Sequence, residues 1–361
     1  MQIFLIGIFV FTILFVLWTY VFYKFFIKFL SRTFGKPVYK GQNWPKLSII
    51  IPTFNEGKVI ERKINNTLEL EYAGNLEIII VDSNSSDNTV QNAQKFKTVK
   101  CIVEKERLGK THALNTALKE SNSEIVVLTD ANCYSMNKNL LIQIVQNFFD
   151  PTIGAVTVPI QHDSSNWKTE SAFWKRERDL WIYESTLDSI PSATGKCLAF
   201  RRSLVEQLNP KCLADDMEII LQVRKKRFRV VSESTGSIFE IVPSQLSGVV
   251  SQKIRRMVNV LSTLSNYKSL MFNPRYGWYG CMILPTRKLF PLLMPFIGFV
   301  SLFSLFFLNF YLGAILVLTL IILVFASSTV RSFLTNQILI VVAWYKYIFK
   351  HYDVAWEKAT R

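Results

Sequence analysis

Acidic side chains follow or precede regular-looking segments at several points of this chain. Asp130 follows the apolar segment 125–128 after one threonine, Asp82 ends an earlier apolar segment, and Asp215 and Asp216 precede a segment with helical spacing. Any one of these acids is most simply a helix cap or a surface carboxylate. In an open α/β sheet, however, ligands bind where the strands end. We therefore expect a polar site centred on Asp130.

Other common kinds of site lack their sequence signatures. No Gly-x-Gly-x-x-Gly sequence follows the first predicted strand and no Walker loop is present, so dinucleotide and P-loop chemistry lack support. The three histidines are scattered and provide no zinc site. Five cysteines without paired spacing argue against a disulfide framework and for a reducing cytosol.

Strands and helices are predicted to alternate from residue 46 to residue 232. Strands are expected where short apolar runs end at turn residues: 46–54, 76–81, 101–103, 125–128, 155–158, 195–200 and 228–232. Helices are expected from residue 56, after residue 87, and over 109–120, 137–149 and 215–226. This alternation predicts a mainly parallel sheet with helices on both faces.

Two uncharged segments are long enough for a membrane. Residues 3–23 approach the ~20 residues that a helix needs to cross a bilayer, and the basic residues after them favour an anchor over a cleaved signal peptide. Residues 289–330 predict a helical hairpin that turns near 309–313. The uncharged segment 332–345 is too short to cross comfortably, so we expect an interfacial helix and a C-terminus on the side of the soluble part.

The positive charge lies beside these apolar segments. Six Lys or Arg and no acid occur in residues 1–46, and ten Lys or Arg and no acid occur between Glu240 and Asp353, against a net charge of +15. A nucleic-acid binder would more often carry its basic patch on the folded domain. The distribution instead suits membrane topology and anionic lipids. Segment 244–267 reads as a basic amphipathic helix, whereas 167–187 suits either a membrane surface or packing on the sheet.

Seven short motifs in this order resemble membrane-integrated family 2 glycosyltransferases. That group includes cellulose, chitin, hyaluronan and poly-N-acetylglucosamine synthases, and the ceramide glucosyltransferases are similar. Each motif is weak alone, but the ordered set is specific and covers roughly 47–260. The motifs are 51–56, 81–87, 109–115, 129–132, 195–201, 214–216 and 252–256, and the tail 356–361 is also similar to such synthases.

The resemblance implies a GT-A type α/β domain, the fold of nucleotide-diphospho-sugar transferases, together with transmembrane helices. It implies five regions in chain order. They are a membrane anchor with a basic segment (1–46), the GT-A domain (47–243), an amphipathic interfacial segment (244–288), a transmembrane hairpin (289–330), and an interfacial helix with a cytosolic tail (331–361).

The resemblance also implies a donor site. Asp82 matches the acid that contacts uracil or ribose, and Thr53 and Glu56 would line the same pocket. Lys110 would reach the diphosphate, although a solvated lysine is the simpler interpretation. Asp130 and Asn132 occupy the Asp-x-Asp position that holds Mg²⁺ or Mn²⁺. Asn132 offers only a neutral carbonyl to such a hard cation, and a cap of the turn is an equally good interpretation of this residue.

Acceptor and diphosphate contacts are implied further along the chain. Asp216 matches the carboxylate that removes the proton from the attacking hydroxyl, and the neighbouring Asp215 would raise its pKa or face solvent. The other residues implied here are Gly195, Gln252, Arg255 and Arg256. Arg256 stands where the family motif has a tryptophan, so the aromatic platform for a growing polymer is absent.

We therefore expect an inverting, metal-dependent hexosyltransferase that uses a nucleoside-diphosphate sugar, with UDP favoured. Its catalytic domain would be cytosolic on a multi-pass cell-membrane protein that contacts lipids and no nucleic acid. The acceptor is a glycan, with processive export as one version, or a membrane lipid that receives one sugar. A non-catalytic scaffold would have lost its acids, and a small transporter would need polar groups in its membrane segments. The sequence leaves the donor sugar, linkage and oligomeric state open.

Overall fold

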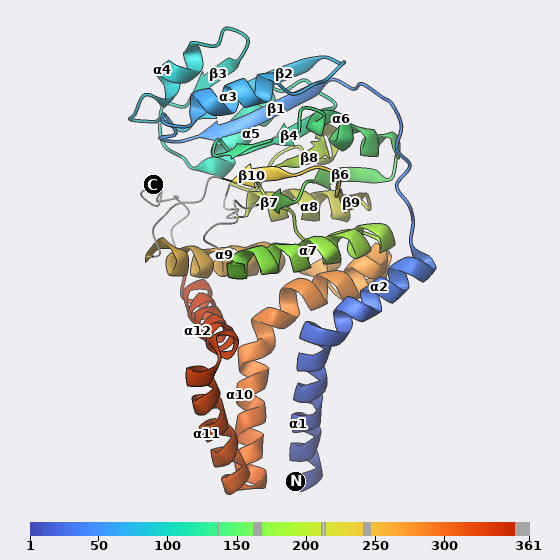
Figure 1. Ribbon diagram of the computed structural model, residues 1–361, viewed down its shortest axis with the longest axis vertical. Coiled ribbons are helices and arrows are strands. Elements are labelled where there is room, and N and C mark those ends of the chain that lie inside the picture. Colours follow the sequence, from blue (N-terminus) through green and yellow to red (C-terminus); the bar gives the residue numbers. More distant parts are fainter. Residues whose placement is uncertain (136, 162–167, 211, 213, 241–246, 351–361) are drawn as a thin grey trace.

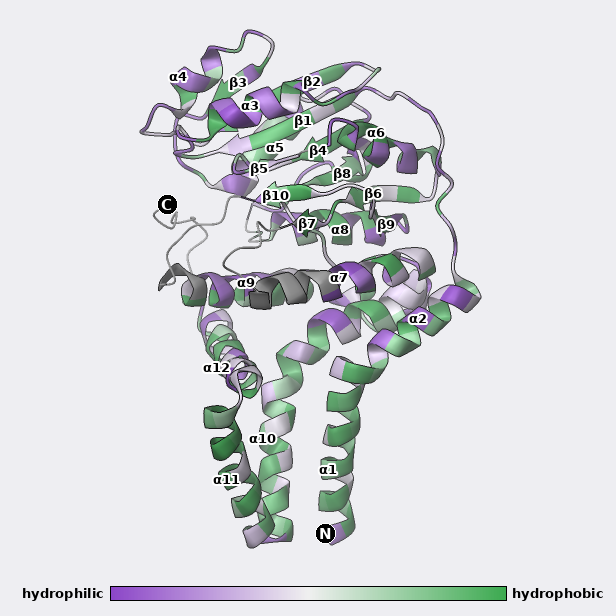
Figure 2. Ribbon diagram, viewed as in Figure 1, coloured by the Kyte–Doolittle hydropathy of each residue, from purple (hydrophilic) through white to green (hydrophobic). Residues whose placement is uncertain are grey.

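The computed structural model describes the chain apart from residues 136, 162–167, 211, 213, 241–246 and 351–361. An α/β part lies on a layer of crosswise helices, and long helices extend from the far side of that layer (Figure 1). The long helices are hydrophobic along most of their length, whereas the α/β part alternates between polar and apolar residues (Figure 2). This division matches the expected GT-A type domain with membrane helices.

The α/β part is built on a seven-stranded sheet. Its strand order is β3-β2-β1-β4-β8-β6-β9, and β8 runs antiparallel to both of its neighbours. The other neighbouring pairs are parallel, so the prediction of a mainly parallel sheet is confirmed. The strands are β1 (Leu47–Thr53), β2 (Leu76–Asp82), β3 (Lys100–Val103), β4 (Ile125–Leu128), β6 (Ile153–Thr157), β8 (Leu198–Arg201) and β9 (Arg229–Ser232).

Alternate side chains of β1 enter two separate hydrophobic cores. Ile49 and Ile51 point to one core and Ile50 to the other, as the two-residue period of a strand requires. Helices cover both faces, because each face is apolar. These helices are α3 (Ile60–Leu68), α4 (Thr89–Gln94), α5 (Lys110–Glu120), α6 (Leu140–Val145) and α8 (Asp215–Lys225).

Two predicted elements differ in extent from those in the structure. The helix expected over 137–149 is α6 followed by a short 3₁₀ helix, Gln146–Phe149. The strand expected over 195–200 begins only at Leu198, so Gly195 lies in the preceding turn. A second, three-stranded sheet was not predicted, because its strands are too short to show a period. They are β5 (Cys133–Tyr134), β10 (Ile238–Glu240) and β7 (Ile160–Gln161).

The crosswise layer joins the sheet to the long helices. α7 (Lys168–Leu187) packs against β9 and against α2 (Tyr23–Phe34), so it is in contact with both the sheet and the N-terminal helix. α9 (Ser247–Asn266) lies alongside in the same layer and packs on α12 (Ser328–Ile348). Helix α8 shares a hydrophobic cluster with these elements through Met217.

Among the residues that the structure describes, two helices are long and apolar enough to cross a membrane. One is Gln2–Phe34, formed by α1 (Gln2–Leu17), a π-helical turn and α2; the other is Tyr279–Leu308, which ends in α10 (Phe290–Leu308). The chain breaks at Asn309, inside the predicted turn, and continues as α11 (Phe310–Ala326).

The last helix is longer than the sequence suggested. α12 contains 21 residues and is bent by 114° from α11, so the pair is either one broken span or a re-entrant loop. Its interfacial placement therefore stays a prediction. The tail 356–361, with its similarity to synthase tails, lies outside the described residues.

Candidate active site

Two neighbouring parallel strands bring Thr53 and Asp82 together. The register of β1 and β2 pairs these residues, and the Thr53 hydroxyl donates to Asp82 Oδ1 at 2.9 Å. Asp82 also accepts hydrogen bonds from the backbone N–H and the hydroxyl of Ser85, at 2.8 and 2.6 Å. Asp82 is fully buried. Its carboxylate therefore holds the turn after β2, and any contact with a donor would come in addition to this Asx-type role.

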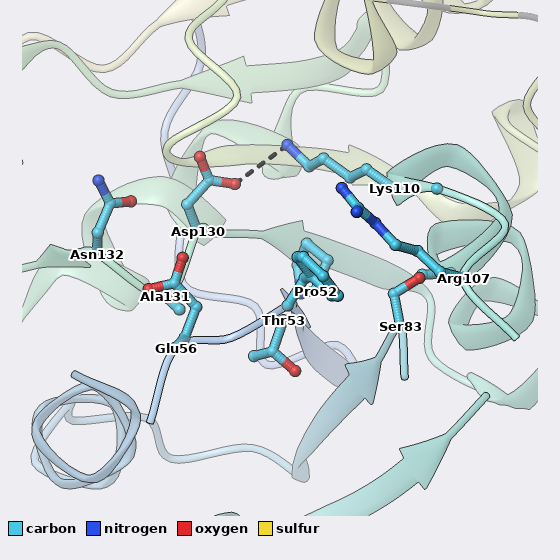
Figure 3. A pocket seen from close by; sticks show the side chains of 12 residues that line it. Pro52, Thr53, Glu56, Ser83, Arg107, Lys110, Asp130, Ala131 and Asn132 are labelled. Atoms are coloured by element: carbon cyan, nitrogen blue, oxygen red, sulfur yellow. Dashed lines mark hydrogen bonds and ion pairs between the residues drawn. The ribbon is translucent and has the colours of Figure 1, made fainter. Parts of the chain in front are cut away.

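A cavity of about 540 Å³ opens beside these strand ends (Figure 3). The predicted donor and metal residues Thr53, Glu56, Lys110, Asp130 and Asn132 all line it, whereas Asp82 does not. The other lining residues were not predicted as site residues from the sequence; they are Pro52, Phe54, Ser83, Arg107, Gly109, Ala113 and Ala131.

One missed feature of this cavity is a cation–π pair. The Arg107 guanidinium carbon lies 3.9 Å from the centre of the Phe54 ring. Phe54 follows β1 and Arg107 precedes α5, so the pair joins two loops at the cavity wall. A positive, planar surface of this kind suits a nucleotide, with its flat base and anionic phosphates.

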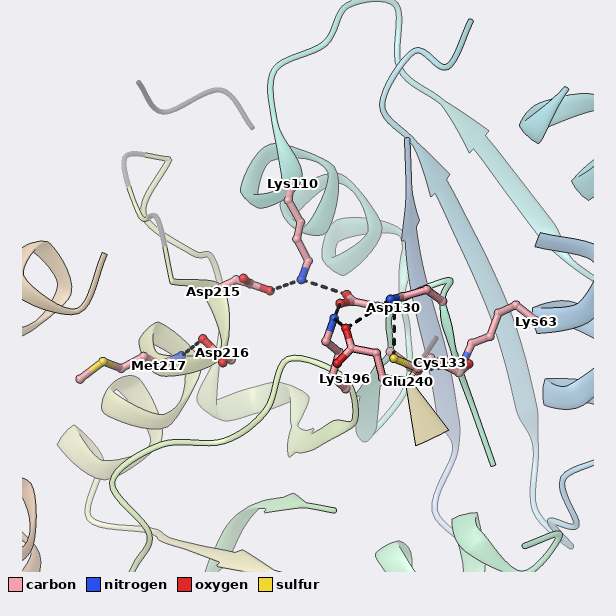
Figure 4. A network of polar contacts seen from close by, with 11 residues as sticks. Lys63, Lys110, Asp130, Cys133, Lys196, Asp215, Asp216, Met217 and Glu240 are labelled. Carbon is pink, nitrogen blue, oxygen red and sulfur yellow. Dashed lines mark hydrogen bonds and ion pairs between the residues drawn. The ribbon is translucent and has the colours of Figure 1, made fainter. Parts of the chain in front are cut away.

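Asp130 lies between two lysines (Figure 4). Lys110 Nζ is 3.1 Å from Asp130 Oδ1, and Lys196 Nζ is 2.9 Å from Asp130 Oδ2. Burial alone would raise the pKa of Asp130, but the two ammonium groups outweigh burial and hold that pKa well below its ordinary value. Asp130 is therefore ionised across the physiological range. Lys196 was not identified from the sequence.

A buried lysine fixes the turn that carries Asp130. Lys63, on α3, donates to the Thr129 hydroxyl and to the Cys133 carbonyl, both at 2.8 Å. Burial lowers the pKa of Lys63. Because its two partners flank the turn on either side, Lys63 ties both ends of the loop to one helix.

Asn132 is almost completely buried within this loop. Its side-chain N–H donates to Glu240 Oε1 at 3.3 Å, and its Oδ1 accepts from the Cys133 thiol at 3.6 Å. Glu240 in turn contacts Lys196 at 2.8 Å. Asn132 thus contacts both Cys133 of the turn and the Glu240 carboxylate. These contacts are compatible with either predicted role, as a metal ligand or as a cap of the turn.

Asp215 and Asp216 open α8 on the opposite side of Lys110. Lys110 Nζ is 2.9 Å from Asp215 Oδ2, so one ammonium group contacts both Asp130 and Asp215. Asp216 Oδ1 accepts from the Met217 backbone N–H at 2.8 Å. Burial, followed by the neighbouring Asp215 charge, raises the pKa of Asp216 to about 6, against a smaller opposing effect of Lys110.

The remaining predicted residues lie at different distances from this centre. A Cβ atom on Gly195 would be 3.7 Å from Lys110 Nζ and 3.7 Å from Asp216 Cβ, so the turn containing Gly195 borders the acid pair. Gln252, Arg255 and Arg256 lie on α9 and do not line the cavity. Gln252 and Arg256 are exposed, and Arg255 is half-buried.

The donor set of the site fits a hard divalent cation. Asp130, Asn132 and Glu240 offer oxygen atoms, the ligands that Mg²⁺ and Mn²⁺ prefer, and the acids already hold ammonium groups. Within the part of the chain that the structure describes, no three His, Cys, Asp or Glu side chains form a complete cage. A cation here would share its ligands with substrate phosphates, as is usual for Mg²⁺.

The fold and the strand-end cavity define a GT-A type nucleotide-diphospho-sugar transferase domain. A mannosyltransferase from Pyrobaculum calidifontis, solved in complex with GDP-Man and Mn²⁺, has the same fold, with a TM-score of 0.78, 24% identity, and coverage of 96% of this chain and 100% of that one. Residues 48–208 match the family model described as Glycosyl transferase family 2, the family that the sequence motifs resemble.

Curated relatives agree with this assignment. The chain is 28% identical over 206 residues to "Probable glycosyltransferase YdaM" of Bacillus subtilis (strain 168), a match covering 50% of this chain and 46% of that protein. It is 25% identical over 226 residues to the poly-beta-1,6-N-acetyl-D-glucosamine synthase of Staphylococcus aureus (strain COL), covering 58% of this chain and 53% of that protein. The aligned region therefore spans about half the length of each curated relative.

Proposed function

We propose that this protein transfers a hexose, with inversion, from a nucleoside-diphosphate sugar to an acceptor hydroxyl at the cytosolic membrane face. The observation that carries the proposal is the position of Lys110. Its ammonium group contacts Asp130 on the donor side at 3.1 Å and Asp215 on the other side at 2.9 Å. The expected diphosphate site and the expected base are therefore neighbours, as a displacement reaction requires.

The donor would occupy the cavity between the strand ends and α5. The nucleoside lies against Thr53, Glu56 and the Arg107–Phe54 pair, and the diphosphate lies toward Lys110 and Asp130. Asp130 and Asn132 would hold a Mg²⁺ or Mn²⁺, which would supply positive charge to neutralise the diphosphate. Lys110 adds a positive charge that is already fixed in place, so little reorganisation is needed as the leaving group forms.

Asp216 acts as the general base. Its carboxylate takes the proton of the acceptor hydroxyl while the hydroxyl oxygen bonds to the anomeric carbon from the face opposite the diphosphate. The bond from that carbon to the diphosphate oxygen breaks, and its electron pair leaves with the nucleoside diphosphate. A pKa near 6 suits this role, because Asp216 is then ionised at neutral pH and is more basic than an ordinary carboxylate.

The membrane side of the site favours an acceptor that sits in the bilayer surface. Met217, directly after the base, belongs to the hydrophobic cluster that contains Tyr279 and Leu292 of the membrane helix. The apolar windows of the two candidate spans are only 6% and 22% buried within the described chain. Most of the surface of these helices is thus open to lipid, and Met217 joins the proposed base to them, so single transfer to a lipid acceptor is favoured.

Polymer synthesis remains the second candidate. It is favoured by the poly-N-acetylglucosamine synthases among the relatives. Against it, the exposed side chain of Arg256 lies on α9 at the position where the family motif has tryptophan. A guanidinium group pairs with a phosphate rather than stacking on a sugar as tryptophan does.

A donor panel tests the proposal. The full chain, in detergent with membrane lipids, is supplied with UDP- and GDP-sugars and Mn²⁺ or Mg²⁺, and release of the nucleoside diphosphate is measured. We expect release with at least one donor, and mass spectrometry should show a lipid enlarged by one hexose. A ladder of longer products would replace lipid transfer by polymer synthesis. No release with any donor, from protein that binds UDP or GDP, would contradict the transferase proposal.

A further inference from the structure

Strand pairing places Glu240 beside the metal motif. β10 runs antiparallel to β5, and its register sets Glu240 opposite Cys133, the residue after Asn132. The Glu240 side chain reaches Asn132, whose N–H donates to Oε1 at 3.3 Å. More than one hundred residues separate these side chains along the chain, and only the small sheet brings them together.

Glu240 and Asp130 both contact the same ammonium group. Lys196 Nζ lies 2.9 Å from Asp130 Oδ2 and 2.8 Å from Glu240 Oε1 (Figure 4). Two carboxylates from different elements therefore face one point in space, and a positive charge lies at that point. The Lys196 side chain is only 19% exposed, so this ammonium group belongs to the site rather than to the surface.

The site also lacks a charge that Glu240 can supply. Asn132 provides a neutral oxygen where an Asp-x-Asp motif would provide a second carboxylate. Ligand charge is one of the main factors that set the affinity of an oxygen site for a divalent cation. Asp130 alone, with two lysines against it, would attract such a cation weakly, whereas Asp130 and Glu240 together restore two negative charges.

We propose that Glu240 is the second carboxylate ligand of the divalent cation and that the Lys196 ammonium group marks the place of that cation. The inference rests on the proposed metal-dependent transfer and extends it to residues outside the motif. It implies that Lys196 and the cation compete for Asp130 and Glu240, so that removing Lys196 favours the cation.

The test is direct Mn²⁺ binding, measured by electron paramagnetic resonance on the full chain, with Mn²⁺ alone and with Mn²⁺ plus UDP or GDP. We expect Glu240→Gln to weaken Mn²⁺ binding about 10-fold or more, and Glu240→Asp to recover part of that loss. Lys196→Met should bind Mn²⁺ more tightly than the unaltered protein. Glu120→Gln, which removes an exposed carboxylate paired with Lys100, should leave binding unchanged.

The outcomes distinguish a failure of this inference from a failure of the proposed function. If Asp130→Asn abolishes Mn²⁺ binding while Glu240→Gln leaves it unchanged, the inference is wrong and the metal site at Asp130 stands. If the unaltered protein binds no Mn²⁺ with either nucleotide, the metal dependence of the proposed function is wrong. Should Glu240→Gln unfold, Lys196→Met decides, since an unchanged affinity in that folded variant would also overturn the inference.

Discussion

At the scale of single residues, Asp216 should separate catalysis from donor binding. Asp216→Asn keeps the side-chain shape and the hydrogen bond from the Met217 N–H but cannot accept the proton of the acceptor. We expect the turnover rate to fall by on the order of 10²–10⁴-fold. The affinity for UDP or GDP, measured by calorimetry, should change little. A variant that keeps normal turnover would show that another group is the base.

The pH dependence of turnover should report the same residue. Asp216 must be ionised to act, and its pKa is about 6, so turnover should rise through pH 6 and level off above it. Asp215→Asn removes a like charge that raises this pKa. The acidic limb of the profile should therefore move to lower pH in that variant, whatever its maximal rate. An acidic limb that stays in place would mean that Asp215 does not act on the base.

Site residues beside a clearly patterned strand or helix could be recognised from the sequence, whereas those on turns and very short strands could not. Asp130 is recognisable because four buried residues of one strand precede it, and Lys110 because it opens a helix. Lys196 stands in a turn before an antiparallel strand, and Glu240 ends a strand of three residues. No periodicity marks such positions, and their contacts with Asp130 depend on pairing between distant segments.

At the scale of elements, a buried ionic cluster joins the crosswise layer to the membrane helices. Arg287 contacts Glu177 at 2.6 Å and Glu184 at 2.9 Å, both on α7, and the Tyr23 hydroxyl of α2 donates to Glu184 at 2.8 Å. Burial raises the pKa of Glu184 to about 7, although Arg287 opposes this. One arginine thus compensates two acids, of which Glu184 is the more easily neutralised.

Removing the arginine should therefore cost more than removing that acid. Arg287→Met leaves the buried Glu177 and Glu184 without their cationic partner, and we expect a loss of about 3–5 kcal/mol in the free energy of unfolding. Glu184→Gln should cost clearly less, because the group is already partly protonated near neutral pH. Denaturant unfolding in detergent measures both, with exposed Arg275→Met as the control. Equal losses in the two variants would contradict the cluster's proposed charge balance.

At the scale of the whole molecule, one hydrophobic cluster links chemistry to membrane. It contains Met217, the residue after the proposed base, together with Leu180 of α7, Val258 of α9 and Ile340 of α12. Segment 244–267 was expected to be a basic amphipathic helix, and segment 167–187 was expected either at a membrane surface or against the sheet. In the structure α7 and α9 lie in one layer beneath the sheet (Figure 1), and α7 packs against β9. The sequence could not give this arrangement, because an apolar helix face does not specify its partner.

The orientation of the whole chain follows from the charges at the helix ends. Basic residues lie after α1, on the side of the α/β part. Lys346 lies in the last turn of α12, the helix that packs on α9. The turn at Asn309, by contrast, carries no charge. From the positive-inside bias we therefore predict that the α/β part is cytosolic and that the turn lies outside. In a background lacking exposed Cys281 and half-buried Cys101, Tyr311→Cys should react with a membrane-impermeant thiol reagent from outside intact cells. Lys346→Cys should react only after the cells are opened, and labelling of Lys346→Cys from outside would make α11 and α12 one broken span whose end emerges on the far side.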